Sequence, residues 1–204
     1  MTVTAAFLVL DPPLDRLALL LAYIRPVVGE VVIVVDDRTA NAATMAAWPG
    51  VKLVPFTWCD DFSAARNAAL PHCTGDWILH LDPDELPSAA MLDFIRTVDA
   101  EPQVDVEWQD VTYHAPRGWL FFTRNWFDGM PAPEYEEHWH CRMFRRTAGR
   151  WYKRIHEQIA LEGFPEDETR GTPGMPKAPL AAHLLHSRMN DAAIDAAYAR
   201  IEEA

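Results

Sequence analysis

Cysteine and glycine are scarce in this sequence of 204 residues, and each scarcity argues against a class of protein. The three cysteines, Cys59, Cys73 and Cys141, are odd in number and widely spaced. They match neither a disulfide framework nor a CxxC pair. The nine glycines form no cluster after a predicted strand, which argues against a phosphate-cradling glycine-rich loop. We therefore expect free thiols in a protein of the reducing cytoplasm.

Basic residues and long apolar runs are also lacking. Eighteen Lys and Arg residues stand against 30 Asp and Glu residues, so the formal net charge is -12. Sequence-independent binding to a nucleic-acid backbone needs a basic surface instead. No apolar stretch is long enough to span a bilayer. Residues 1–10 lead directly into a strand-like run, without the basic n-region of a signal peptide. We expect neither a nucleic-acid partner nor a membrane span.

Apolar residues, by contrast, are abundant. They make up 50% of the chain, and aromatic residues make up 11%. This is enough to bury one sizeable core, whereas 204 residues are few for two domains. The 16 prolines predict many interrupted elements and long connections. We expect one ordered, loop-rich domain over residues 1–204.

Strand and helix patterns alternate along the first hundred residues. The β-branched run Val31–Val35 suits a strand that is buried on both faces of a parallel sheet. The alternation predicts an α/β fold with a mixed, mainly parallel sheet flanked by helices, whose ligands bind beyond the carboxyl ends of the strands. The second half is less regular. We expect strands at 2–10, 31–35, 51–56, 76–81, 104–114, 119–127 and 138–146, helices at 14–24, 41–47, 63–70, 88–98 and 191–203, and a flexible loop at 163–179.

Three carboxylates follow directly after the strand predicted at 76–81. Asp82, Asp84 and Glu85 would repel one another there, and a divalent cation would remove that conflict. Carboxylate oxygens suit Mg²⁺ or Mn²⁺, which fill their remaining positions with water and phosphate oxygens. The pattern therefore favours a metal site for a diphosphate. The alternative is that Asp84, Glu85 and Ser88 only cap the next helix.

Two further groups of polar residues lie near strand ends. Asp36 and Asp37 close the second predicted strand, where they can accept hydrogen bonds from a ribose hydroxyl or a base N–H, or belong to a turn. Asp61 can cap a helix whose first turns present Arg66 and Asn67 as hydrogen-bond donors for phosphates or base edges. An internal ion pair of Arg66 with Asp61 or Asp82 is the alternative.

The two-part motif formed by residues 61–67 and 74–85 resembles the family 2 glycosyltransferases, especially the bacterial and phage branch related to the glycopeptide S-glycosyltransferases. The resemblance continues through Arg142–Arg145 and Ile155–Glu157, with a further possible match at His183–His186. It implies a GT-A (Rossmann-like) fold. Residues 1–100 would form the nucleotide-sugar-binding half, and residues 101–204 the acceptor-side half with a C-terminal helix.

The resemblance also implies a reaction and roles for individual residues. A sugar would pass from a nucleotide-sugar donor, with UDP-sugars favoured, to a protein, peptide or glycan acceptor. The resemblance also implies inversion at the transferred sugar. The cofactor would be Mn²⁺ or Mg²⁺, held by Asp82 and Asp84, with His156 or His186 as a further ligand. Glu157 is the first candidate for the catalytic base, ahead of Glu137 and Glu136. The implied donor-binding residues are Asp11, Asp36, Asp37, Asp61, Arg66, Asn67 and Asp82.

Departures from the family pattern keep other functions open. Asp11-Pro12 stands where relatives have Asn-Glu, and the motif after the second strand lacks the usual Gly-Ser and ends in Asn41. A non-catalytic nucleotide- or glycan-binding module, or a metal-dependent nucleotidyltransferase or phosphohydrolase, is the alternative. The run 138–141 contains two histidines and a cysteine, but strand alternation places Cys141 on the opposite face, which argues against zinc.

Overall fold

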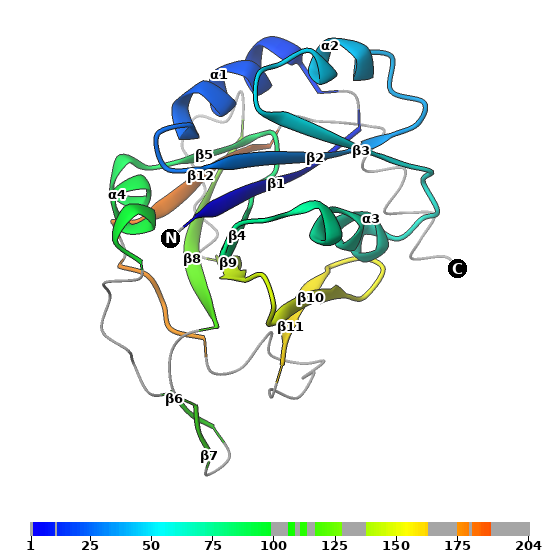
Figure 1. The fold of residues 1–204 in the computed structure, drawn as a ribbon. Helices are drawn as coiled ribbons and strands as arrows, with labels where there is room; N and C mark the ends of the chain where they lie inside the picture. Colours follow the sequence, from blue (N-terminus) through cyan, green and yellow to red (C-terminus); the bar gives the residue numbers. More distant parts are fainter. Residues whose placement is uncertain are drawn as a thin grey trace.

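The computed structural model describes residues 2–10, 12–98, 106–108, 111–113, 117–127, 138–162, 175–179 and 181–188. An eight-stranded sheet organises these residues (Figure 1). Its strands, in spatial order, are β3 (Val51–Phe56), β2 (Glu30–Asp36), β1 (Val3–Val9), β4 (Trp77–His80), β9 (His138–Arg145), β8 (Gly118–Phe127), β12 (His183–Arg188) and β5 (Glu85–Pro87).

The first four strands of this order are parallel, because β1 pairs in parallel with β2 and β4, and β2 with β3. All seven residues of β1 and six of the seven in β2 are buried, as expected for strands that are covered on both faces. The other half is mixed, since β9 is antiparallel to β4 and β8, while β12 is parallel to β8. The predicted mixed, mainly parallel sheet is confirmed.

Helices cover both faces of the sheet, and the sheet separates two apolar clusters. The helices are α1 (Leu14–Ile24), α2 (Ala42–Ala46), α3 (Phe62–Ala69), α4 (Ala89–Thr97) and the 3₁₀-helix η1 (Leu70–His72). The first cluster contains Leu17 of α1 and Phe94 of α4. The second contains Ala65 of α3, together with Trp151 of β10 (Gly149–Tyr152) and Ile159 of β11 (Gln158–Leu161). The β10–β11 hairpin therefore packs on the same side as α3.

The predicted elements agree with the structure in the first half and less well in the second. The single strand predicted at 104–114 is wrong, because β6 (Val106–Trp108) and β7 (Val111–Tyr113) are two short strands paired antiparallel. The sequence reading also missed β5, β12 and the β10–β11 hairpin. Of the loop predicted at 163–179, residues 175–179 are described, and Lys177 forms an isolated bridge with Leu120. The helix predicted at 191–203 lies outside the described residues.

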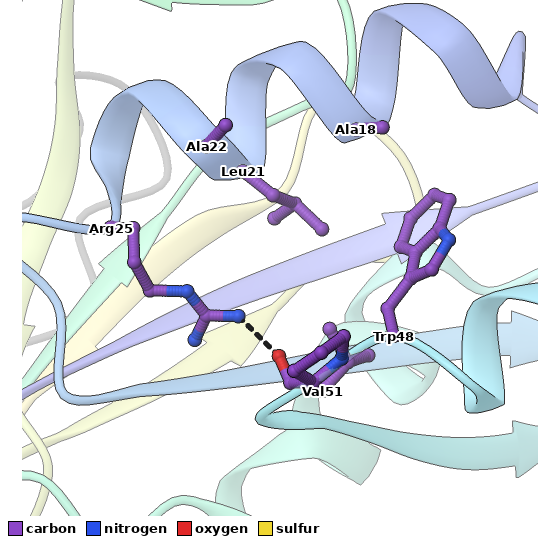
Figure 2. A pocket seen from close by; sticks show the side chains of 7 residues that line it. Ala18, Leu21, Ala22, Arg25, Trp48 and Val51 are labelled. Carbon is purple, nitrogen blue, oxygen red and sulfur yellow. Dashed lines mark hydrogen bonds between the residues drawn. The ribbon is translucent and has the colours of Figure 1, made fainter.

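A groove of about 320 Å³ lies between α1 and the turn that joins α2 to β3 (Figure 2). The Arg25 guanidinium at the end of α1 donates a hydrogen bond to the carbonyl oxygen of Pro49 across this groove. The lining residues are Ala18, Leu21, Ala22, Arg25, Trp48, Pro49 and Val51. They include no carboxylate, so this groove is not the site predicted from the acidic residues. No helix in the described part of the chain has the length and apolar character needed to cross a bilayer.

Candidate functional site

The carboxylates predicted at the end of β4 lie on a tight turn, Asp82–Glu85, called the acidic turn below. The Glu85 N–H donates to the Asp82 carbonyl oxygen at 3.0 Å. In return, the Asp82 N–H donates to Glu85 Oε2, also at 3.0 Å. Pro83 occupies the second position, where its fixed φ favours a turn. The helix that follows is capped by Ser88, whose hydroxyl accepts the Met91 N–H, so Glu85 belongs to the turn rather than to the helix cap.

Two arginines from different elements contact the acidic turn. Arg66 of α3 donates to Asp82 Oδ1 at 3.0 Å and to Glu157 Oε1 at 2.6 Å. Arg142 of β9 contacts Asp82 Oδ2 at 3.3 Å and also donates to Glu85 Oε1. The internal pairing of Arg66 with Asp82 was one of the alternatives from the sequence. The pairing with Glu157, and the whole contribution of Arg142, were not predicted.

The charges in this group do not balance. The acidic turn and Glu157 contribute four carboxylates, whereas the two arginines contribute two positive charges. His80 adds no charge, because burial lowers its pKa well below the ordinary value and the nearby Arg66 lowers it further, although Asp82 opposes this. Counted over these described side chains alone, negative charges exceed positive charges by two, a difference that a bound divalent cation would offset.

The rings of His80 and Trp151 pack against each other next to this charged group. The His80 ring meets the Trp151 ring edge to face, with centroids 4.9 Å apart. The Arg66 guanidinium lies 5.1 Å from the centre of the same indole. His80 Nε2 is buried and 3.4 Å from Asp82 Oδ1. The Trp151 indole therefore lies against Arg66, whose side chain is only 8% exposed.

The start of α3 agrees with the sequence prediction in one respect and adds to it in another. Asp61 is the N-cap, and its carboxylate accepts the Ala64 N–H at 2.8 Å. The Asn67 amide donates to the Trp151 carbonyl oxygen at 2.9 Å and accepts the Trp151 N–H at 2.8 Å. These two bonds join α3 to β10. Contact of Asn67 with a donor stays a prediction, and the described contacts give it a structural role.

Asp36 and Asp37 lie at the carboxyl end of β2, on the same edge of the sheet as the acidic turn, because β1, β2 and β4 are parallel (Figure 1). Asp36 is buried and accepts hydrogen bonds from the backbone and guanidinium of Arg38. These bonds lower the pKa of Asp36. Asp37 is exposed and accepts the Thr57 hydroxyl at 2.7 Å.

The remaining predicted site residues have different positions. His156 is exposed next to Glu157 and has a positive φ of 49°. The loop containing it is attached to α3 because the Phe62 N–H donates to the Arg154 carbonyl oxygen. His186 is paired with Glu85 in the β12–β5 register, so its backbone lies beside the acidic turn, while its side chain is not described. The predicted residues Asp11, Glu136 and Glu137 lie outside the described residues.

The described donor set limits how a metal could be held. Within the described residues, no group of three or more His, Cys, Asp or Glu side chains is arranged to hold a metal ion. Asp82 and Asp84 would supply one or two carboxylate oxygens, as is usual for Mg²⁺ when substrate phosphates complete the shell. The excess of negative charge fits this arrangement. Burial raises the pKa of the Cys141 thiol to about 12, so the free thiol is protonated at neutral pH.

Comparison with known proteins connects this geometry to a family. The family model described as "Glycosyl transferase family 2" matches residues 28–152, which include α3, the acidic turn and Arg142. A relative from Rickettsia felis, "Uncharacterized glycosyltransferase", is 27% identical over 101 residues, covering 50% of this chain and 35% of the relative. A "TPR repeat-containing protein" from Synechococcus elongatus is 59% identical over 49 residues, covering 24% of this chain and 11% of that protein.

Two solved structures have a similar fold. S. aureus TarS 1-349 in complex with UDP-GlcNAc has a TM-score of 0.55 at 14% identity, covering 94% of this chain and 60% of that one. The same protein in complex with UDP has a TM-score of 0.52 at 12% identity, covering 98% and 63%. The chain thus spans less than two thirds of each of these proteins. Because the family model matches more than half of its length, the chain belongs to glycosyl transferase family 2, and its sheet and helices have the GT-A fold.

Proposed function

We propose that this protein is an enzyme that transfers a sugar from a nucleotide-sugar donor to a protein, peptide or glycan acceptor, with inversion. The observation that carries the proposal is the acidic turn at the carboxyl end of β4, where Arg66 joins Asp82 to Glu157. Ligands of such sheets bind at this edge. The UDP-GlcNAc and UDP complexes of TarS, which has a similar fold, support a uridine nucleotide as the donor's leaving group.

The donor would lie along the carboxyl edge of β1, β2 and β4. Within one domain, residues 1–100 would form the nucleotide-sugar-binding half and residues 101–204 the acceptor-side half. Asp37 is exposed at this edge and would accept hydrogen bonds from the base or ribose. Asp11, Asp36, Asp61 and Arg66 complete the proposed donor-binding set, whereas the two hydrogen bonds of Asn67 to the backbone of Trp151 favour a structural role for that residue. The free cysteines support a reducing compartment, the cytoplasm.

Asp82 and Asp84 would hold Mn²⁺ or Mg²⁺, with His156 or His186 as a further ligand. When bound, this ion would neutralise the charge that develops on the departing nucleoside diphosphate. Arg66 would keep Asp82 oriented through its bond to Oδ1. The same arginine lies in a largely buried position beside Trp151, so it would also exclude water from this side of the turn.

Glu157 would accept the proton of the attacking acceptor group, with Glu137 as the second candidate. Arg66 donates from Nε to Glu157 Oε1, and its Nη2 forms an ion pair with the same oxygen. This contact would fix the direction of the carboxylate and leave Oε2 to accept the proton. The Glu157 side chain is only 7% exposed. This burial also favours a second candidate function, a non-catalytic nucleotide- or glycan-binding module in which the Arg66–Glu157 pair is structural.

Calorimetric titration of UDP, GDP, CDP and dTDP, each with and without Mn²⁺, tests the proposal. We expect one nucleotide to bind in a metal-dependent manner, and Asp84→Asn to abolish that binding. Asp93→Asn is the matched control, because it removes an exposed carboxylate of α4 that is paired with Arg96 in the same helix. Absence of nucleotide binding under every condition would overturn the proposal.

A second variant separates the enzyme from the binding module. Glu157→Gln should retain metal-dependent nucleotide binding and lose sugar transfer, because the amide cannot accept the acceptor's proton. Release of the nucleoside diphosphate measures donor hydrolysis or sugar transfer. If the wild-type protein binds the nucleotide but releases none from any UDP-sugar, the binding module becomes the better explanation.

A further inference from the structure

Arg142 is the extra residue of a β-bulge next to the acidic turn. In the β8–β9 pairing, Trp119 is opposite Met143, whereas the next residue, Leu120, is opposite Cys141. Arg142 therefore falls between two consecutive pairs. The β4–β9 pairing ends with Leu79 opposite Met143, so β4 and β9 separate just where Arg142 lies. A bulge bends the strand and redirects a side chain, and here that side chain reaches the acidic turn.

Arg142 contacts both ends of the turn. Its Nη2 group donates to Glu85 Oε1 and lies 3.3 Å from Asp82 Oδ2. The Glu85 side chain is 0% exposed, and its second oxygen, Oε2, accepts the Asp82 N–H. Arg66 binds the other oxygen of Asp82. Two arginines on separate elements thus hold the two oxygens of one carboxylate, and the direction of Asp82 is set from both sides.

The pair of Arg142 with Glu85 is poorly explained as a device for stability. Burying two charges costs their hydration, and apolar residues of similar volume often serve the core as well or better. Arg142 Nε is also buried with no hydrogen-bond partner among the described residues, which adds to the cost. An arrangement that is costly for the core and directed at a functional turn indicates control of the turn's shape.

We propose that Arg142 is a positioning residue that holds the acidic turn in one shape before any ligand arrives, and thereby strengthens joint binding of a divalent cation and a nucleoside diphosphate. The binding part of this inference rests on the proposed function. A preformed turn pays less ordering entropy when the ligand binds. Residues that orient metal ligands usually change metal affinity by about 10- to 100-fold when they are replaced.

The test separates positioning from simple structural support. Arg142→Met alone removes the guanidinium that is paired with the buried Glu85 carboxylate, so it should lower the melting temperature for that reason. Combining it with Glu85→Gln removes both charges and keeps an oxygen that can accept the Asp82 N–H. We expect this double variant to recover most of the melting temperature, while its affinity for UDP in the presence of Mn²⁺ stays about tenfold below wild type. Arg145→Met is the control, because this arginine of the same strand stacks on Trp77 instead.

Hydrogen exchange in the ligand-free protein gives a readout that needs neither metal nor turnover. Amides of the acidic turn should exchange faster in the double variant than in wild type, and Arg145→Met should leave them unchanged. Wild-type affinity for UDP with Mn²⁺ in the double variant would overturn the inference that Arg142 strengthens ligand binding. If wild-type protein binds no nucleotide at all, the proposed function fails, whereas unchanged exchange of the turn would separately refute the positioning role.

Discussion

Replacing Asn67 distinguishes a residue that binds the donor from one that holds two elements together. In the structure, its amide makes two hydrogen bonds of 2.8 and 2.9 Å to the backbone of Trp151. Trp151 is 5% exposed, so water cannot easily replace the lost partners in Asn67→Ala. A net value of about 1 kcal/mol for each bond, with an added penalty for buried groups left unpaired, gives a loss of about 3 kcal/mol.

For a domain of this size, a loss of about 3 kcal/mol lowers the melting temperature by about 10 °C. Thermal and urea denaturation measure this directly. At a temperature where the variant is fully folded, its affinity for UDP with Mn²⁺ should change by no more than about twofold. The reason is that the Asn67 amide already makes its hydrogen bonds to Trp151. An unchanged melting temperature together with a large loss of nucleotide affinity would refute the structural role and restore Asn67 to the donor site.

Two other changes test contacts near strand ends, one steric and one electrostatic. Gly75→Ala should be destabilised by about 2 kcal/mol, because a Cβ there would lie 2.7 Å from the backbone nitrogen of Thr4. Gly29→Ala is the matched control, because a Cβ at that position would have no atom nearer than 3.9 Å. Equal melting temperatures for the two variants would contradict this prediction. Asp36→Asn should lower stability at neutral pH, because Arg38 holds the pKa of Asp36 below its ordinary value. That stabilisation exists above the unfolded-state pKa and is lost as the pH falls through the lowered folded-state pKa, so the gap between the two proteins should close in acid; a gap independent of pH would contradict it.

The parts of the fold that follow local patterns could be predicted from the sequence. The β-branched run Val31–Val35 becomes β2, which is buried on both faces, because continuous apolar strands belong in covered parallel sheets. Asp61 caps α3 as predicted, since its hydrogen bond is to an amide only three residues away. The single strand predicted at 104–114 failed because propensity alone does not show where a strand breaks into a hairpin.

The contacts that define the candidate site could not be predicted in the same way. Arg66 and Glu157 are 91 positions apart, and nothing in the local sequence of either residue identifies the other. The position of Arg142 depends on a one-residue shift between β8 and β9, and such a register shift depends on both strands and their neighbours. The resemblance drew attention to the runs containing these residues without assigning their partners.

The placement of β5 has a consequence for the order in which this protein can fold during synthesis. Glu85 both closes the acidic turn and begins β5, which pairs with Leu184–His186 of β12. Almost one hundred residues must therefore leave the ribosome after the acidic turn before its closing strand finds a partner, and contacts of such long range form slowly. A nascent chain that ends before β12 would contain Asp82, Asp84 and Glu85 without the strand that anchors them. The acidic turn would then gain its strand partner late, although its own residues lie in the first half of the chain.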